Sequence, residues 1–280
     1  MGFLKGLAIS LLSFLLFLSL SIFGLVLMLN QTILNPNFIV TELNKLDVSA
    51  LAEEFLSEQI PQEVISDTIA DLEPWIKEQA GILTYSTYDY ITGKSQSLSV
   101  AISLEPLKDN LWQAFLESPP PELAAVPQAE LEQYFDESYE QLGIPDMFDE
   151  SFFPTEVQMA MGQARQYVGY FQLGYKLLIV FIVLLIAGII LINRQVRSAT
   201  RGLGIVFLSF GALEYAGIFI VNRLLGTQLM QLDLPPSLQA WLPQFLGDLL
   251  APLGIFSIGV AVAGVVLIVV SIIYKRKPAV

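Results

Sequence analysis

The 280-residue sequence contains no cysteine and no histidine. The absence of cysteine excludes disulfides, thiol nucleophiles and thiolate metal sites, and the absence of histidine excludes imidazole metal ligands and imidazole acid–base chemistry. The motifs H-E-x-x-H, G-x-S-x-G, Walker A and G-x-G-x-x-G do not occur either. We therefore assign no catalytic, cofactor-binding or metal-ligating residue, and expect a protein that is not an enzyme.

Charged residues are also scarce, at 15% of the chain, whereas 54% of the residues are hydrophobic and the mean hydropathy is +0.60. Apolar residues gather in four long runs, at Leu7–Leu29, Leu177–Ile192, Leu203–Val221 and Leu253–Tyr274. A bilayer core about 30 Å thick needs roughly 20 apolar residues in helical form, because lipid cannot hydrogen-bond an open backbone. The sequence therefore predicts four transmembrane helices.

The basic residues near these runs predict the orientation of the chain. Most of them fall on one side if all four runs cross the membrane: Lys5, Arg194, Arg197, Arg201, Lys275, Arg276 and Lys277. Lys176 and Arg223 fall on the other side as a minority. Because lysine and arginine are retained on the cytoplasmic side, we expect both termini in the cytoplasm and the chain in the cell's cytoplasmic membrane.

These observations divide the chain into eight segments. They are a signal-anchor transmembrane helix (1–29), an acidic extracytoplasmic domain with a helical stalk (30–174), a second transmembrane helix (175–193), a cytoplasmic loop (194–201), a third transmembrane helix (202–223), an extracytoplasmic loop with an amphipathic helix (224–250), a fourth transmembrane helix (251–274) and a basic cytoplasmic tail (275–280). The first run is longer than the roughly 7–15 apolar residues of a signal peptide and ends without a small-x-small pattern, so we expect it to be retained.

The segment 30–174 is strongly acidic. It holds 24 of the 27 acidic residues and five of the 14 basic ones, a net charge of −19. Such a field repels nucleic acid and favours cations, basic partners or simple solubility. Three clusters of carboxylates are candidates for calcium binding: Glu53/Glu54, Asp136/Glu137 and Asp146/Asp149/Glu150. None has EF-hand spacing, so we interpret them as solvated helix faces.

Most of this segment has helical periodicity. Asn35 and Pro36 are a helix cap followed by a proline at the first helical position, and Pro61 and Pro74 are expected to open further helices. Further helices are predicted over 51–59, over 106–117 and from Leu131 to the glycine at 143. The capping box that begins at Thr155 predicts one long helix as far as Asn193.

One passage has the periodicity of a strand. Apolar and polar residues alternate over 97–104, which predicts a half-buried strand. Its partner is either a second strand around Ile82–Tyr90, forming a hairpin across the turn at Thr92 and Gly93, or the same strand of another subunit. The fold class we expect is mainly α, with four transmembrane helices and a mostly helical extracytoplasmic domain containing one strand or hairpin.

Glu214 is the one acidic residue within a predicted span. An ionised carboxylate at the centre of a bilayer costs about 2.5–3.5 kcal/mol on insertion scales, so we expect this side chain to face the helix bundle. It has either a structural role, with a hydrogen bond to Ser257, Tyr215 or Ser209, or a role as a proton or cation relay. No ionisable residue at matching depth in another span completes a relay, which favours the structural role.

Small residues predict which helix faces pack closely. They are Ser209, Ala212 and Ala216 in the third span, and Ser257/Ala261 and Gly259/Ala263 in the fourth. Small-xxx-small spacing lets helices approach closely in lipid. We expect the second to fourth spans to form a bundle to which the first is attached more loosely.

Three functions are compatible with these features. In the first, the acidic ectodomain mediates protein interaction or scaffolding at the outer face of the membrane, with another protein or a second copy of the chain as partner. The second is a transport or channel component that uses Glu214, and the third is a membrane-embedded enzyme without histidine or cysteine. The first is favoured because the spans are almost uniformly apolar, whereas a pore needs polar lining. The lipid bilayer is the only other expected partner, and no cofactor or nucleic acid is expected.

Overall fold

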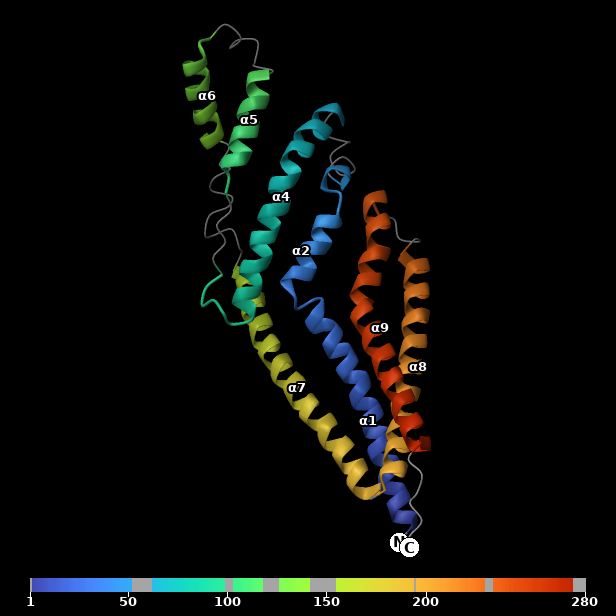
Figure 1. Ribbon diagram of the computed structural model, residues 1–280. Helices are drawn as coiled ribbons and strands as arrows, with labels where there is room; N and C mark the ends of the chain where they lie inside the picture. The colour runs from blue at the N-terminus through green and yellow to red at the C-terminus, as the bar shows by residue number, and fades with distance from the viewer. Residues whose placement is uncertain are drawn as a thin grey trace. The chain divides into compact units, whose positions relative to one another are not determined.

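The fold was analysed in a computed structural model that describes residues 2–51, 62–98, 103–117, 126–141, 155–193, 195–229 and 234–273. These residues form helices and their connections, and they include no strand (Figure 1). The named helices are α1 (Gly2–Gln31), α2 (Pro36–Lys45), α4 (Gln62–Ile91), α5 (Glu105–Glu117), α6 (Gln128–Gln141), α7 (Thr155–Asn193), α8 (Val196–Leu229) and α9 (Pro236–Ile273).

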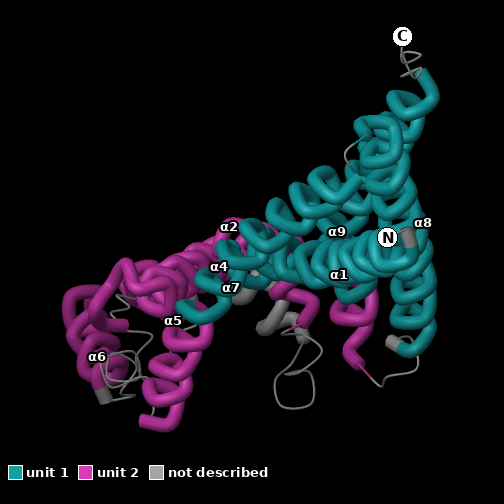
Figure 2. The backbone as a smooth tube through the Cα atoms, turned by 90° about the horizontal axis from the view of Figure 1, so that it is seen from below, with its two compact units in different colours: residues 1–35, 169–233, 242–280 teal, residues 36–168, 234–241 magenta. Residues whose placement is uncertain are grey.

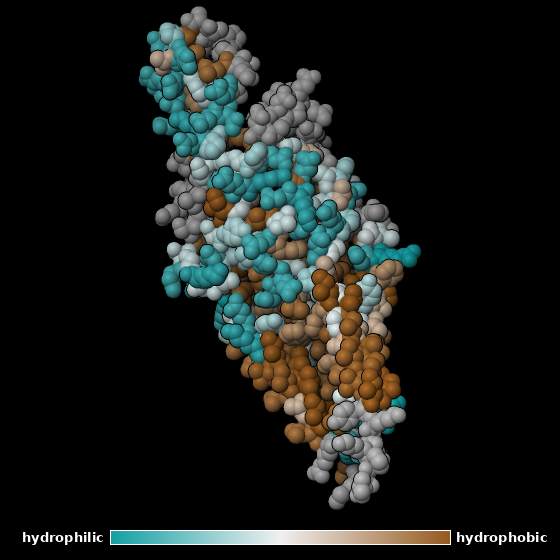
Figure 3. Space-filling model, in the orientation of Figure 1, coloured by the Kyte–Doolittle hydropathy of each residue, from teal (hydrophilic) through white to brown (hydrophobic). Residues whose placement is uncertain are grey.

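Four helices are long and apolar enough to cross a membrane: α1, α7, α8 and α9. At about 1.5 Å per residue, even the 30 residues of α1 exceed a hydrocarbon core about 30 Å thick. The prediction of four membrane-length apolar helices is confirmed. On the face that Figure 3 shows, hydrophobic side chains dominate the parts of the long helices that belong to unit 1, whereas hydrophilic side chains dominate the surface of α4, α5 and α6.

The chain forms two compact units (Figure 2). Unit 1 comprises residues 1–35, 169–233 and 242–280, and unit 2 comprises residues 36–168 and 234–241. The helices α7 and α9 contribute to both, since α7 changes unit after Val168 and α9 after Trp241.

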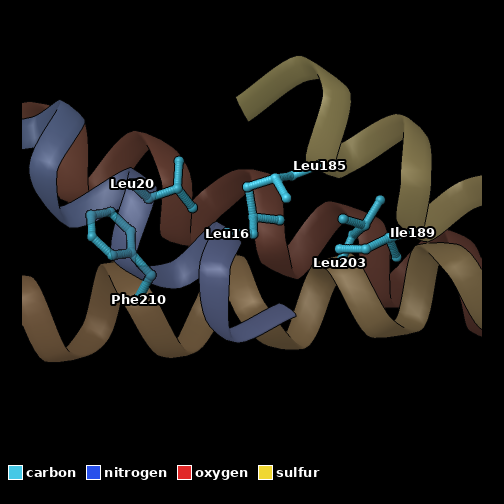
Figure 4. Close-up of a cluster of buried hydrophobic side chains, with 6 residues drawn as sticks. All are labelled: Leu16, Leu20, Leu185, Ile189, Leu203 and Phe210. Atoms are coloured by element: carbon cyan, nitrogen blue, oxygen red, sulfur yellow. The ribbon is translucent and has the colours of Figure 1, made fainter. Parts of the chain in front are cut away.

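The core of unit 1 joins three of the long helices. Its buried side chains are Leu16 and Leu20 from α1, Leu185 and Ile189 from α7, and Leu203 and Phe210 from α8 (Figure 4). The aromatic ring of Phe210 is fully buried and meets Phe17 and Phe256 edge to face, each with ring centroids 5.8 Å apart. The helix α9 thus reaches the same core through Phe256.

The first span is the most deeply packed of the four, which corrects the expectation that it is attached loosely. Of its most apolar stretch, 28% is buried, against 11–17% in α7, α8 and α9. Gly24 shows how closely α1 meets α9, because a β-carbon there would lie 2.7 Å from Leu253 Cδ1. Sequence periodicity missed this, since a helix that is apolar all round gives no sign of its contact face.

Glycines bring α8 and α9 into backbone contact. A β-carbon on Gly211 would lie 2.7 Å from the backbone nitrogen of Ala261, and one on Gly264 would lie 2.9 Å from the carbonyl oxygen of Gly204. The predicted role of Ser257 and Ala261 in close packing is confirmed. The predicted face of α8 is wrong, because Ser209, Ala212 and Ala216 are exposed and Gly204 and Gly211 make the contact. Gly259 in α9 is exposed as well.

The turn from α7 to α8 is held by the buried side chain of Asn193. Its amide nitrogen donates to the carbonyl oxygen of Ile189 at 2.9 Å, and its amide oxygen accepts from the Ser198 hydroxyl at 2.9 Å. The Lys5 ammonium lies 3.5 Å from the carbonyl oxygen of Asn193, where a cation complements the negative end of the α7 dipole. The predicted loop 194–201 is already helical from Val196, because Ser198 and Asn193 together cap the tight turn.

In unit 2, polar contacts join α2 and the following residues to α4. Tyr85 donates to the side-chain oxygen of Asn37 at 2.7 Å, and Lys77 donates to the carbonyl oxygen of Asn44 at 3.1 Å. Glu73 accepts from the Ser49 hydroxyl at 2.7 Å and pairs with Lys77 at 2.6 Å. The start of α2 at Pro36 agrees with the predicted cap.

Pro74 does not open a new helix, as we had expected from the sequence, but lies inside α4. A proline inside a helix removes one backbone hydrogen bond and clashes with the preceding turn, at a cost of about 3 kcal/mol. The contacts of Glu73 and the hydrogen bond from Trp75 Nε1 to the carbonyl oxygen of Ser103, at 2.7 Å, hold the chain on both sides of it.

The predicted hairpin is wrong, because its first strand, Ile82–Tyr90, belongs to α4. Long-range packing and the helical propensity of the preceding turns outweigh the β-branched and aromatic content of this stretch. Of the strand expected over 97–104, residues 99–102 lie outside the described residues, and the described ends are not strand. The helix expected over 51–59 also lies almost wholly outside the described residues.

Two predicted segments merge in α9. The sequence suggested an amphipathic helix within 224–250 and a separate span from residue 251, but one helix continues through Pro243 and Pro252. The helix starts at Pro236, because a proline at the first helical position has no N–H that would need an intrahelical partner. Likewise, α7 runs unbroken over 39 residues, as the capping box at Thr155 predicted.

Candidate functional site

Glu214 lies on the packed face of α8, one turn beyond Phe210 and Gly211, and is half-buried. It makes no hydrogen bond or ion pair with any residue that the structure describes. The hydroxyl of Ser257, one of its expected partners, donates instead to the carbonyl oxygen of Leu253 at 2.7 Å. A proton relay needs a second ionisable group bonded to Glu214. Among the described residues of unit 1, no ionisable group forms a hydrogen bond or ion pair with it.

Carboxylates do not gather into a metal site in the parts of the chain that the structure describes. Asp136 pairs with Lys108 at 2.8 Å, and Glu137 accepts from the Gln133 amide at 3.0 Å. A lysine and a glutamine amide are the partners that carboxylates on a solvated helix surface commonly have. The other two carboxylate groups considered for calcium, at 53–54 and 146–150, lie outside the described residues.

Unit 2 contains a groove between α5 and α6, with a volume of about 390 Å³. Ligand pockets range from about 300 to 1,000 Å³, so this groove is large enough for a side chain or a small molecule. Its lining combines aromatic rings with charged groups: Leu104, Glu105, Lys108, Asp109, Trp112, Glu132, Phe135, Asp136 and Tyr139.

Aromatic packing forms the floor of this α5–α6 groove. The ring of Phe135 lies between those of Trp112 and Tyr139, with centroid distances of 5.2 Å and 6.1 Å. Phe115 closes the cluster at 5.7 Å from Phe135. Phe135 and Tyr139 are one turn apart on α6, so helical periodicity alone brings them to the same face.

Charge is unevenly distributed around the groove. Four carboxylates line it, from Glu105, Asp109, Glu132 and Asp136, but only one cation, Lys108. The ion pair with Asp136 raises the pKa of Lys108, so this lysine stays charged at neutral pH. The other three carboxylates make no ion pair with a described residue, which leaves the groove net negative.

Tyr139 lines the groove and is only 6% exposed, yet its hydroxyl has no hydrogen-bond partner. Burial raises the pKa of this hydroxyl, so it is neutral and keeps its proton at physiological pH. Leaving a buried hydroxyl unpaired costs about 1–3 kcal/mol. A ligand in the groove that carries a donor or an acceptor would remove this cost.

A second buried polar group lies on α2. Glu42 is 2% exposed, and one carboxylate oxygen pairs with Lys45 at 2.7 Å while the other, Oε2, has no partner. Its backbone carbonyl accepts from Trp241 Nε1 at 3.1 Å, which joins α2 to the start of α9 within unit 2. No described cavity opens onto it, so we treat it as structural.

Sequence reasoning found part of the groove. The apolar stripe of α6 was visible from the spacing of Leu131, Phe135 and Tyr139, but it indicated packing rather than a site. The contribution of α5, with Lys108 and Trp112, was missed. The sequence did contain a sign of the groove. Glu105 and Asp109 are four residues apart on one helix, and Glu132 and Asp136 are four apart on the other, so each pair lies on one helix face.

The long apolar helices and their shared core define a multi-pass membrane protein, and unit 2 adds a small helical domain with an acidic aromatic groove. Comparison of the chain with family models, with curated proteins and with solved structures gives no match.

Proposed function

We propose that this membrane protein presents unit 2 at the outer face of the cytoplasmic membrane, where it binds a partner protein. In this proposal the chain acts by binding and not by catalysis. The observation that carries the proposal is the concentration of polar chemistry in one unit. The segment 30–174 has a net charge of −19, and it includes the α5–α6 groove with its unpaired tyrosine hydroxyl.

The packing of unit 1 supports the proposal that unit 1 anchors the protein and unit 2 binds the partner. Its helices pack through leucine, isoleucine and phenylalanine side chains and through glycines, which is what an anchor requires. Glu214, the one carboxylate in α8, has neither an ionic partner nor a hydrogen-bond partner among the described residues. A channel needs rings of polar groups or carbonyls along a path, whereas the buried cluster that joins α1, α7 and α8 consists of leucine, isoleucine and phenylalanine side chains.

The basic residues support the proposal that unit 2 lies outside. Lys5 and Arg197 flank the ends of α1 and α8 that would face the cytoplasm, and the basic tail follows α9. An acidic field outside the membrane steers basic partners and repels anionic lipid headgroups. We therefore expect a partner with a basic surface.

Photo-crosslinking tests the proposal in the native membrane. A photoreactive phenylalanine analogue replaces Tyr134, which is 49% exposed on α6, and in a matched control it replaces Tyr215, which is 52% exposed on α8. We expect a protein-sized adduct from position 134, weakened by added salt, and none from position 215, which contacts lipid. An adduct from neither position, at a crosslinking efficiency that labels lipid from position 215, contradicts the proposal.

A further inference from the structure

The lining of the α5–α6 groove carries a net negative charge. Three of its four carboxylates, those of Glu105, Asp109 and Glu132, lack an ion-pair partner among the described residues. A ligand anion would meet a net negative lining, whereas a cation would meet several acceptors at once. The aromatic floor adds attraction, because the faces of tryptophan and tyrosine rings carry negative charge density.

Lys108 shows which cation fits. Its ammonium pairs with Asp136 at 2.8 Å and lies 5.7 Å from the ring centroid of Tyr139. This lysine therefore already places an alkylammonium between a carboxylate and an aromatic ring inside the groove. It uses one of the four carboxylates and leaves the positions near Asp109 and Glu132 for a second group of the same chemistry.

The hydroxyl of Tyr139 indicates which kind of ammonium group fits the groove. It is buried and has no partner, so a ligand with an N–H donor would give its oxygen a hydrogen bond. A primary ammonium has three N–H donors, whereas a quaternary ammonium has none. The groove thus favours the unmodified lysine head group over its trimethylated form, although both carry the same charge.

We propose that the α5–α6 groove binds the primary ammonium of a lysine side chain presented by the partner protein. This inference rests on the proposed function for the source of the lysine, but the chemistry of the groove can be measured without the partner. The lysine ammonium would lie against Glu132 and Tyr139, and its alkyl stem would pack on Trp112.

Calorimetric titration of the full-length protein in lipid nanodiscs tests this directly. The probe is the blocked peptide Gly-Lys-Gly, compared with its Nε-acetyl-lysine and Nε-trimethyl-lysine forms and with free n-butylamine. We expect the lysine peptide to bind at least tenfold more tightly than the acetylated peptide, which has lost its charge. We expect it to bind several-fold more tightly than the trimethylated peptide, which keeps its charge but cannot donate to Tyr139.

Variants separate the groove from the general acidic field. Glu132→Gln should weaken binding of the lysine peptide about fivefold or more, and Glu137→Gln, a matched change on α6 outside the groove, should alter it less than twofold. Tyr139→Phe should weaken binding of lysine but not of trimethyl-lysine, while the melting temperature of the protein stays level or rises. Equal losses in Glu132→Gln and Glu137→Gln, or no effect of Tyr139→Phe on lysine binding, overturn the inference.

The two proposals fail separately. Binding of butylamine without binding of the lysine peptide shows that the groove takes a small free amine, and overturns the lysine assignment. If the lysine peptide binds as expected but Tyr134 yields no protein adduct in the native membrane, the groove chemistry stands and the proposed function fails. If the adduct forms equally in the wild type and in Glu132→Gln, the proposed function stands and the groove is not the lysine site.

Discussion

Gly211 of α8 and Ser257 of α9 lie in backbone contact: a β-carbon on residue 211 would collide with the carbonyl oxygen of Ser257. The neighbouring Ala261 is equally close, with its backbone nitrogen 2.7 Å from that position. A carbonyl and a backbone nitrogen belong to a rigid helix and cannot rotate away as a side-chain tip can. The two helices must therefore separate to admit any larger residue.

Substitution of Gly211 by alanine should consequently destabilise the protein. Overpacking of a close contact costs about 1–3 kcal/mol, and separation of α8 from α9 also loses the van der Waals packing that holds helices together in lipid. Gly217 on the same helix is the control, because a β-carbon there meets nothing within 4 Å, and alanine is favoured over glycine in a helix by about 1 kcal/mol. Thermal unfolding in detergent should rank the variants Gly217→Ala at or above wild type and Gly211→Ala below it. Equal melting temperatures would show that α8 and α9 do not meet at these residues.

The packing of the first span makes a second prediction. Leu16 is fully buried in the core of unit 1, whereas Leu11 on the same helix is 57% exposed. Leu16→Ala should cost about 2–5 kcal/mol because it leaves a cavity, and Leu11→Ala should have little effect. Thermal unfolding of both variants measures the difference. A Leu16→Ala variant as stable as Leu11→Ala would mean that α1 is a loosely attached anchor, as the sequence alone suggested.

These two cases show where sequence reasoning succeeds in this chain and where it stops. Length and hydropathy located the four spans, and proline and threonine signals located the starts of α2 and α7, because these depend on local chemistry. The contact faces could not be predicted, since small residues occur on more than one face of α8, and the spacing of Ser209, Ala212 and Ala216 fits close packing as well as that of Gly204 and Gly211 does. The α5–α6 groove also stayed hidden, because it needs residues about 30 positions apart on two helices to come together.

Glu214→Gln tests the role of the intramembrane carboxylate. Because Glu214 has no described hydrogen-bond partner to lose, and an ionised carboxylate in lipid costs about 2.5–3.5 kcal/mol, the amide should leave stability unchanged or raise it. Melting temperatures of the wild type, Glu214→Gln and Glu214→Ala should therefore agree or rise. A drop in both variants would restore the structural role that was expected from the sequence.

The environment of Glu73 predicts a dependence of stability on pH. Hydrogen bonds from Lys77 and Ser49 hold the pKa of Glu73 below its ordinary value. A carboxylate whose pKa is lowered on folding adds stability above its unfolded pKa of 4.5, and this contribution is lost as the pH falls through the folded pKa.

Glu73→Gln should therefore be less stable than wild type at pH 7, by about 0.5–1 kcal/mol for a partly exposed pair. The difference should shrink as the pH falls below 4.5 and through the lowered folded pKa of Glu73. Thermal unfolding over a series of pH values from 7 downward measures the difference, with Glu78→Gln, an exposed position on the same helix, as the control. A destabilisation of Glu73→Gln that does not diminish anywhere in this series would assign the effect to packing instead of charge.

The central claim is that the acidic unit lies outside the membrane while the turn from α7 to α8 lies in the cytoplasm. The absence of cysteine makes single-cysteine labelling unambiguous, since any signal comes from the introduced residue. Gln133→Cys places an exposed thiol on α6, and Gln195→Cys places one in the turn. With a membrane-impermeant maleimide on intact cells stripped of any outer wall, position 133 should be labelled at once and position 195 only after the membrane is permeabilised. Labelling of position 195 but not 133 in intact cells would contradict the account.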